Sequence, residues 1–105
     1  MIPYYISDCK VTDRGWEYGG SGVSQSHQGT CQRWDTDTPH SGYQDLNFHP
    51  DSSWGDAANL CRNPDIDPGG IWCYVDNPAI RIGFCQVPIC GMVIFIFSQI
   101  YVFNI

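Results

Sequence analysis

Apolar and polar residues alternate with a period of two in only two short stretches of the chain, Thr30 to Trp34 and Ile71 to Val75. This period is typical of strands, whose successive side chains point to opposite faces. Elsewhere, small and turn-forming residues interrupt any regular pattern, as in Gly19-Gly20-Ser21-Gly22, Pro39-His40-Ser41-Gly42, Asn63-Pro64-Asp65 and Pro68-Gly69-Gly70. The pattern predicts a loop-rich chain with short strands and little helix.

The same pattern divides the chain into three parts. Residues 1–8 form a short lead, and residues 9–90 contain every cysteine, every tryptophan and the turn signals. Residues 91–105 carry no charged side chain and are rich in β-branched and aromatic residues. We therefore expect one compact domain over residues 9–90, preceded by an N-terminal lead and followed by an apolar tail.

The apolar tail is open to three interpretations. A bilayer-spanning helix needs about 20 apolar residues, and the tail has fifteen residues, so it could be a truncated membrane span. Its β-branched and aromatic composition also fits a strand-prone extension. A third interpretation is an artefact of the gene model. Contact with a membrane is expected only under the first interpretation.

Composition suggests how so small a domain is held together. A chain of 105 residues has room for one domain, whose core alone buries little apolar surface. Six cysteines, eleven glycines and seven prolines point to disulfides formed in an oxidising compartment. The first seven residues lack the basic and apolar regions of a signal peptide. We therefore expect an extracellular or secreted domain that is a fragment of a longer chain.

The charge of the chain bears on its partners. Eleven acidic residues against five basic ones give a formal net charge of −6. Such a surface repels the phosphates of nucleic acids and anionic membrane faces. The charge therefore argues against nucleic acid as a partner and favours proteins with basic groups.

Neither a metal site nor a catalytic motif is expected. Structural zinc sites use pairs of ligands two to four residues apart, and only Cys85 and Cys90 come close to that spacing. No nucleophile elbow, phosphate-binding glycine loop or Ser-His-Asp arrangement occurs in the sequence. We expect no cofactor, no metal and no enzymatic activity. Spacing by itself does not choose among the possible disulfide pairings of six cysteines.

Six short motifs accompany the cysteines: Tyr18-Gly-Gly20, Cys31-Gln-Arg-Trp34, Thr38-Pro-His40, Asn59-Leu-Cys-Arg-Asn-Pro-Asp65, Trp72-Cys-Tyr74 and Cys85-Gln-Val-Pro-Ile-Cys90. With these motifs, residues 9–90 resemble the kringle family. The resemblance implies a small disulfide-rich fold, mostly loops with short antiparallel β ribbons, that serves as a non-catalytic extracellular protein-binding module. It also implies three disulfides, joining Cys9 to Cys90, Cys31 to Cys73 and Cys61 to Cys85.

The resemblance further implies a site for lysine, because ligand-binding kringles hold lysine side chains and C-terminal lysines in a shallow trough. The anionic end would be Asp65 and Asp67, the aromatic floor Trp72 and Tyr74, and the cationic end Arg81. Two carboxylates suit an ammonium group, which has three donors, and aromatic faces cover its methylene stem. Residues two apart in an extended segment point to one side. We therefore expect both carboxylates together and both rings on an exposed platform.

These assignments have alternatives. Trp72 could be an ordinary core residue, and Arg81 could be a solvated surface arginine or a partner of Asp76. Ligand-binding relatives have a tryptophan at the position of Ile82 and a basic residue at the position of Gln44. The competing interpretation is therefore a lysine-blind kringle, a spacer or interaction surface within a larger receptor or serine protease.

The remaining aromatic residues and histidines are assigned to structure. We expect Trp34 and Tyr18 in the core, and His40 as a hydrogen bonder that fixes a turn. His27 and His49 have no convergent partners in the sequence. The segment from Phe48 to Ala58 is one residue longer than the family pattern, so the sequence does not place Trp54.

Overall fold

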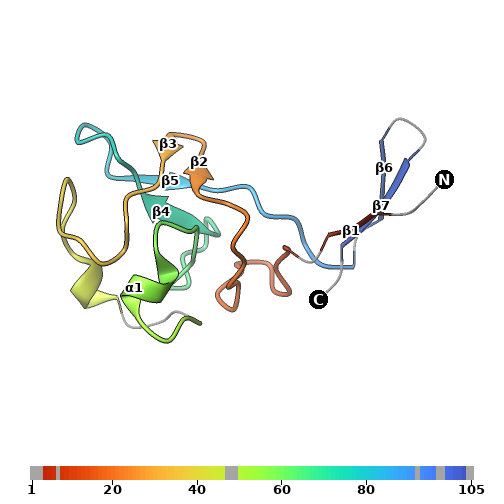
Figure 1. Ribbon diagram of the computed structural model, residues 1–105, viewed down its shortest axis with the longest axis horizontal. Helices are drawn as coiled ribbons and strands as arrows, with labels where there is room; N and C mark the ends of the chain where they lie inside the picture. Colours follow the sequence, from red (N-terminus) through yellow and green to blue (C-terminus); the bar gives the residue numbers. More distant parts are fainter. Residues whose placement is uncertain (1–3, 7, 47–49, 92, 97–98, 104–105) are drawn as a thin grey trace.

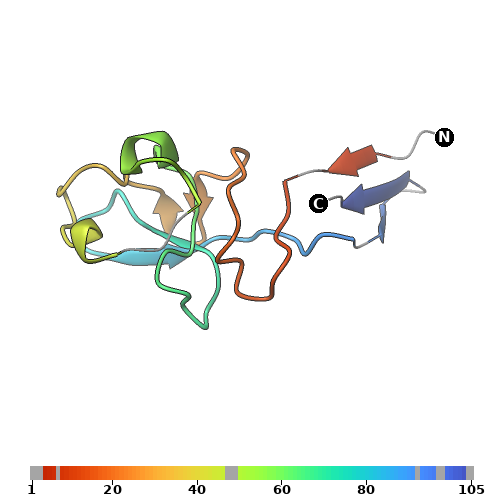
Figure 2. The same ribbon diagram turned by 90° about the horizontal axis from the view of Figure 1, so that it is seen from below.

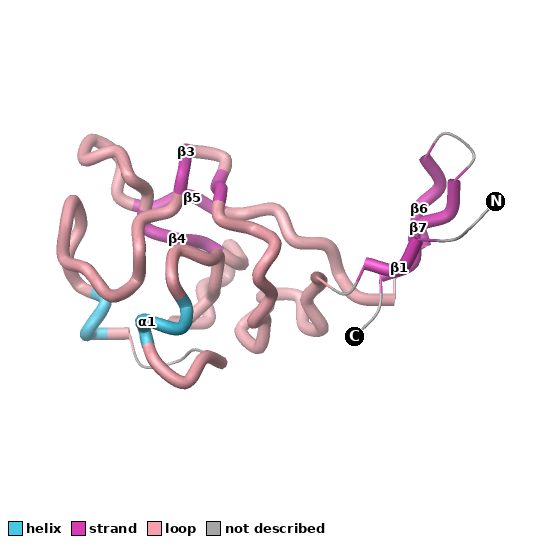
Figure 3. The backbone as a smooth tube through the Cα atoms, viewed as in Figure 1, coloured by secondary structure: helices cyan, strands magenta, loops and turns pink. Residues whose placement is uncertain are grey.

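The computed structural model describes residues 4–6, 8–46, 50–91, 93–96 and 99–103, and its regular elements are all short. In chain order they are β1 (Tyr4–Ile6), β2 (Gln25–Ser26), β3 (Gly29–Thr30), the 3-10 helix η1 (Tyr43–Asp45), α1 (Trp54–Ala57), β4 (Trp72–Tyr74), β5 (Ile82–Phe84), β6 (Val93–Ile96) and β7 (Gln99–Phe103). Loops make up most of the trace between them (Figures 1 and 3). The expected loop-rich fold with little helix is confirmed.

Two antiparallel ribbons form the centre of residues 9–90. Strand β2 pairs with β3, and β4 pairs with β5 so that Cys73 lies opposite Gly83. A Cβ atom at position 83 would come within 2.2 Å of the Ser26 hydroxyl. Glycine at position 83 therefore lets the two ribbons approach each other. The short antiparallel strand pairs agree with the expected fold class.

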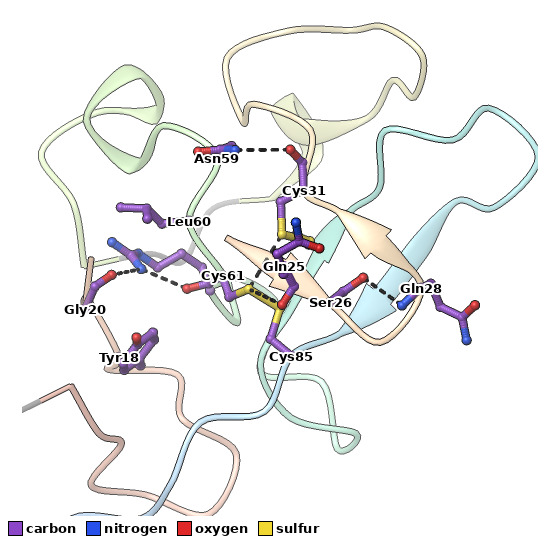
Figure 4. Close-up of a disulfide and its surroundings, with 12 residues drawn as sticks. Tyr18, Gly20, Gln25, Ser26, Gln28, Cys31, Asn59, Leu60, Cys61 and Cys85 are labelled. Atoms are coloured by element: carbon purple, nitrogen blue, oxygen red, sulfur yellow. Dashed lines mark hydrogen bonds between the residues drawn. A yellow bond between two sulfur atoms is a disulfide. The ribbon is translucent and has the colours of Figure 1, made fainter. Parts of the chain in front are cut away.

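Three disulfides close the chain on itself. Cys9 joins Cys90, Cys31 joins Cys73 and Cys61 joins Cys85, across sequence separations of 81, 42 and 24 residues. This is the pairing that the resemblance implies. The two inner bridges touch, because the Sγ atoms of Cys31 and Cys61 lie 3.6 Å apart (Figure 4). Their four sulfur atoms are bonded in disulfides and are therefore not thiolate ligands for a metal.

The aromatic core lies beside these bridges and centres on Trp34, which is fully buried. Its ring packs edge-on against Trp72, with centroids 5.2 Å apart, and lies 5.5 Å from the ring of Trp54. The indole Nε1 donates a hydrogen bond of 2.6 Å to the carbonyl of Leu60. The predicted core position of Trp34 is confirmed. Trp54, which the sequence does not place, begins α1 and joins the same cluster.

The alternation seen at Ile71 to Val75 does not correspond to an alternation in burial. All five residues of this stretch are buried. Strand β4 pairs with β5 on one edge, and Trp72 forms a bridge with Arg62 on the other. Because the rest of the domain covers both faces of so short a strand, the period of two carries no information about exposure here.

A second, three-stranded sheet joins the two ends of the chain. Strand β1 pairs in parallel with β7, with Tyr5 opposite Val102, and β7 pairs antiparallel with β6. This sheet lies beyond the disulfide-bonded part of the molecule (Figure 2). Among the residues that the structure describes, no helix is long and apolar enough to cross a membrane.

Candidate functional site

A trough of about 360 Å³ opens on the side of the β4–β5 ribbon. Nine residues from three separate segments line it: Gly42, Asp45, Leu46, Asp65, Asp67, Trp72, Tyr74, Arg81 and Ile82. All five residues predicted from the sequence to contact a ligand are among them. The fold therefore brings together residues that are up to 40 positions apart, from Gly42 to Ile82.

The acidic segment of the trough is a turn and not the extended segment that was expected. Ile66 has a φ of 53°, a left-handed conformation that is uncommon for a β-branched residue. The buried Asn63 side chain holds the turn by accepting a hydrogen bond of 2.7 Å from the Asp67 amide and donating one of 3.0 Å to the Asp67 carbonyl. Asn63 also donates to the carbonyl of Arg14, at 2.8 Å. Asn63 thus orients the loop that carries Asp65 and Asp67.

The aromatic floor is less exposed than predicted. Trp72 and Tyr74 line the trough, yet their exposed fractions are only 3% and 4%. Their rings meet edge to face with centroids 5.1 Å apart, and Trp34 packs against both rings. The expectation of an exposed platform is therefore wrong, because the core on which these rings rest covers most of their surface. Trp72 is both a core residue and part of the floor.

The two parts of the trough are joined by a hydrogen bond. The Trp72 indole Nε1 donates to an Asp65 carboxylate oxygen at 2.9 Å. Asp67 accepts a hydrogen bond of 2.7 Å from the backbone amide of Gly69. Each carboxylate thus has one oxygen with a partner inside the protein, which orients the carboxylates before any ligand arrives.

Arg81 directly precedes β5, and its side chain is exposed. Its Nη2 donates a hydrogen bond of 2.8 Å to the Ser41 carbonyl, and its guanidinium carbon lies 5.0 Å from the centre of the Tyr74 ring. A Cβ atom at Gly42 would come within 2.9 Å of Nη2. Glycine at position 42, with a φ of 113°, therefore makes room for the docked guanidinium.

Asp45 is a trough residue that sequence reasoning missed. It ends η1, where its amide donates to the Gly42 carbonyl at 3.1 Å. Burial raises the pKa of the Tyr74 hydroxyl; Arg81 opposes this rise, while the charges of Asp65 and Asp45 add to it. No spacing rule connects position 45 to positions 65 and 74. Only the tertiary structure therefore shows that the Asp45 carboxylate is close enough to Tyr74 to influence the pKa of its hydroxyl.

Residues 9–90 of the chain match the family model described as Kringle domain. The chain belongs to the kringle domain family. Kringle domains in general mediate protein interactions and are typically non-catalytic modules, and kringles with three disulfides are typical of extracellular proteins.

Two positions of this kringle domain depart from its lysine-binding relatives, and the structure places both. Ile82 lines the trough and is half-buried. The Gln44 amide turns to Asp37, donating to its two carboxylate oxygens at 3.1 and 3.3 Å, and does not line the trough. The positions at which relatives have an aromatic wall and a second cation are therefore aliphatic and neutral in this kringle.

The two described histidines, His27 and His40, do not line the trough. His40 is buried, its ring nitrogen Nε2 lies 3.0 Å from the Asn77 carbonyl, and its amide donates to the Gln32 side chain at 3.0 Å. The predicted role of His40 as a hydrogen bonder after the Thr38–Pro39 turn is confirmed. His27 is exposed, and His49 lies outside the described residues.

Proposed function

We propose that this kringle domain is an extracellular, non-catalytic module that binds lysine-type groups of protein partners weakly in its trough. The observation that carries the proposal is the convergence of Asp65, Asp67, Trp72, Tyr74 and Arg81 on one trough. Two of these five side chains are acidic, one is basic and two are aromatic.

The chemistry of the trough suits an ammonium group on an apolar stem. Asp65 and Asp67 each have a second oxygen besides the one that accepts from Gly69 or Trp72, so an ammonium can donate a hydrogen bond to both carboxylates. The edges of Trp72 and Tyr74 and the side chain of Ile82 would cover the stem, at about 0.8 kcal/mol for each fully buried CH₂.

Three features of the trough support weak binding. The floor rings are 3% and 4% exposed, so little aromatic surface remains to be covered by a ligand. Ile82 provides no aromatic quadrupole for a cation. Gln44 is paired with Asp37 and provides no positive charge. Each of these differences removes part of the interaction that a lysine-binding kringle makes.

The test is a titration with 6-aminohexanoic acid, followed by tryptophan fluorescence and by calorimetry. The wild type should bind with a millimolar dissociation constant. Asp67→Asn should abolish the response, because Asp65 would be the only carboxylate left in the acidic loop to pair with a partly desolvated ammonium. Ile82→Trp should strengthen binding by about 0.5 to 2 kcal/mol by adding an aromatic wall. Asp13→Asn, which removes an exposed charge outside the trough lining, is the matched control.

The second candidate is a lysine-blind kringle that acts as a spacer or protein-binding surface within a larger receptor or serine protease. The aliphatic Ile82 and the engaged Gln44 favour this alternative. If neither the wild type nor Ile82→Trp responds to millimolar 6-aminohexanoic acid or pentylamine, lysine recognition is wrong and the lysine-blind function stands.

A further inference from the structure

The charges of the trough lining are unbalanced. Three carboxylates, those of Asp45, Asp65 and Asp67, line the trough together with a single guanidinium, that of Arg81. A ligand that carries only a positive charge is attracted by this excess of negative charge. A zwitterion carries a carboxylate into the same field, so its carboxylate is repelled by the charges that attract its ammonium.

The cationic group of the trough is already engaged within the protein. Arg81 donates to the Ser41 carbonyl at 2.8 Å and lies over the Tyr74 ring at 5.0 Å. Gly42 supports the guanidinium in that position, since a Cβ atom there would lie 2.9 Å from Nη2. A ligand carboxylate would have to form its ion pair with this docked group or displace it from the ring, and an exposed ion pair is weak in either case.

Asp45 lies on the same side of the trough as this arginine. It is one turn of η1 from Gly42, with its amide donating to the Gly42 carbonyl at 3.1 Å. Its carboxylate is exposed. The carboxylate of a zwitterion that reaches Arg81 would therefore also meet the like charge of Asp45. Gln44, beside Asp45 in the chain, donates to Asp37 and provides no positive charge for a ligand carboxylate.

We propose that this trough recognises an ammonium and its stem without recognising a carboxylate, so that its partner is a lysine side chain within a polypeptide and not a C-terminal lysine. This inference rests on the proposed lysine function. Asp45 is the residue that sets the preference for an internal over a C-terminal lysine. The ligand class is a primary alkylamine whose far end is uncharged.

The experiment compares two ligands of matched stem length, 6-aminohexanoic acid and pentylamine, by calorimetric titration of the full chain at one ionic strength. Pentylamine should bind as tightly as the zwitterion or more tightly. Nα-acetyl-lysine N-methylamide, which has no carboxylate, should likewise bind at least as tightly as Nα-acetyl-lysine. A zwitterion that binds more than about threefold tighter than pentylamine, the size expected of one exposed charge pair, would overturn the inference.

Asp45→Asn makes the test specific to the proposed residue. Removing this charge should strengthen the binding of 6-aminohexanoic acid relative to pentylamine by about threefold. Asp13→Asn removes an exposed charge outside the trough lining and should leave that ratio unchanged. An unchanged ratio in Asp45→Asn would overturn the role of Asp45.

Failure of this inference is distinguishable from failure of the proposed function. If both ligands bind and the zwitterion is preferred, lysine recognition stands and the preference for an internal lysine is wrong. If neither ligand binds the wild type or Ile82→Trp, both proposals are wrong.

Discussion

The two arginines of the β4 neighbourhood show how this domain separates stability from recognition. Arg62 is 1% exposed and Arg81 is exposed. Arg62 binds both oxygens of Asp51, at 2.8 and 3.1 Å, and donates to the carbonyls of Gly20 and Cys61. Arg81 donates to one carbonyl and lies over one ring. The buried Arg62 thus donates four hydrogen bonds within the protein, whereas the exposed Arg81 donates one.

The difference follows from the cost of burying a charge. A guanidinium removed from water needs a counter-ion and acceptors for its donors, or the fold loses several kcal/mol. Arg62 meets these requirements by pairing with Asp51 and by donating to the carbonyls of Gly20 and Cys61, two residues that Figure 4 shows near Tyr18. At the trough, water still solvates Arg81, so its donors need not all be satisfied by the protein. We infer that mutations around Arg62 change folding and that mutations around Arg81 change binding.

The largest effect is expected for Arg62→Ala. The substitution removes the hydrogen bonds that Arg62 donates to the mostly buried Asp51 carboxylate and to two carbonyls, and should cost about 3 kcal/mol of unfolding free energy. Guanidinium unfolding of the oxidised protein measures this loss. Arg33→Ala, which breaks an exposed pair with Asp35, is the matched control and should leave the midpoint unchanged. Equal losses in the two variants would contradict the distinction between interior and surface.

A smaller effect on stability is expected for Asn63→Ala. Asn63 lies next to the buried Arg62 in the chain and also holds the acidic loop of the trough. Asn63 is fully buried and makes three side-chain hydrogen bonds, so its loss should cost about 2 kcal/mol. It should also release the Asp67 amide, whose hydrogen exchange should become faster. Asn77→Ala removes one exposed hydrogen bond to the Ala79 amide and serves as the control. An unchanged exchange rate at Asp67 would show that Asn63 does not hold the acidic loop.

Gly42→Ala should affect the trough more than the fold. A φ of 113° makes alanine unfavourable by about 1 kcal/mol, and its Cβ would meet the Arg81 guanidinium. Gly29→Ala imposes a similar backbone cost at a φ of 129° without any atom within 4 Å. The two variants should lose similar stability, and only Gly42→Ala should shift the NMR signals of the Arg81 side chain. Unshifted signals would mean that Gly42 does not support the docked arginine.

The smallest effect concerns the tyrosines at alkaline pH. Burial raises the pKa of Tyr18 strongly, with Asp8 adding to the rise and Arg62 opposing it, and burial also raises the pKa of Tyr74. Because the folded pKa lies above the unfolded value of about 10, this contribution to stability is complete below pH 10 and is lost as the pH rises further. Absorbance at 295 nm should show these two tyrosines ionising above pH 10. Tyr18→Phe and Tyr74→Phe should each remove one ionisation step from that range, and an unchanged titration above pH 10 would contradict the assignment.

Much of this fold could be predicted from residue types and motifs. Turn residues and cysteines predict a small loop-rich domain, because glycine and proline restrict regular structure and disulfides replace a large core. The resemblance to the kringle family points to all five predicted trough residues, which do line one trough. The core position of Trp34 and the hydrogen bonds of His40 were also predicted. These features depend on local sequence or on motifs that specify a shared fold.

Other features depended on contacts between distant segments. Residues two apart share a side only if the backbone is extended, and the contacts of Asn63 with Arg14 and Asp67 hold Ile66 in a left-handed turn instead. The exposure of the floor depended on Trp34, which lies 38 positions before Trp72. The sequence by itself therefore determined which residue types the domain would use and where its motifs lie. Only the tertiary structure decided which side chains are exposed and that Asp45 and Gly42 belong to the trough, because burial and charge act through space and not along the chain.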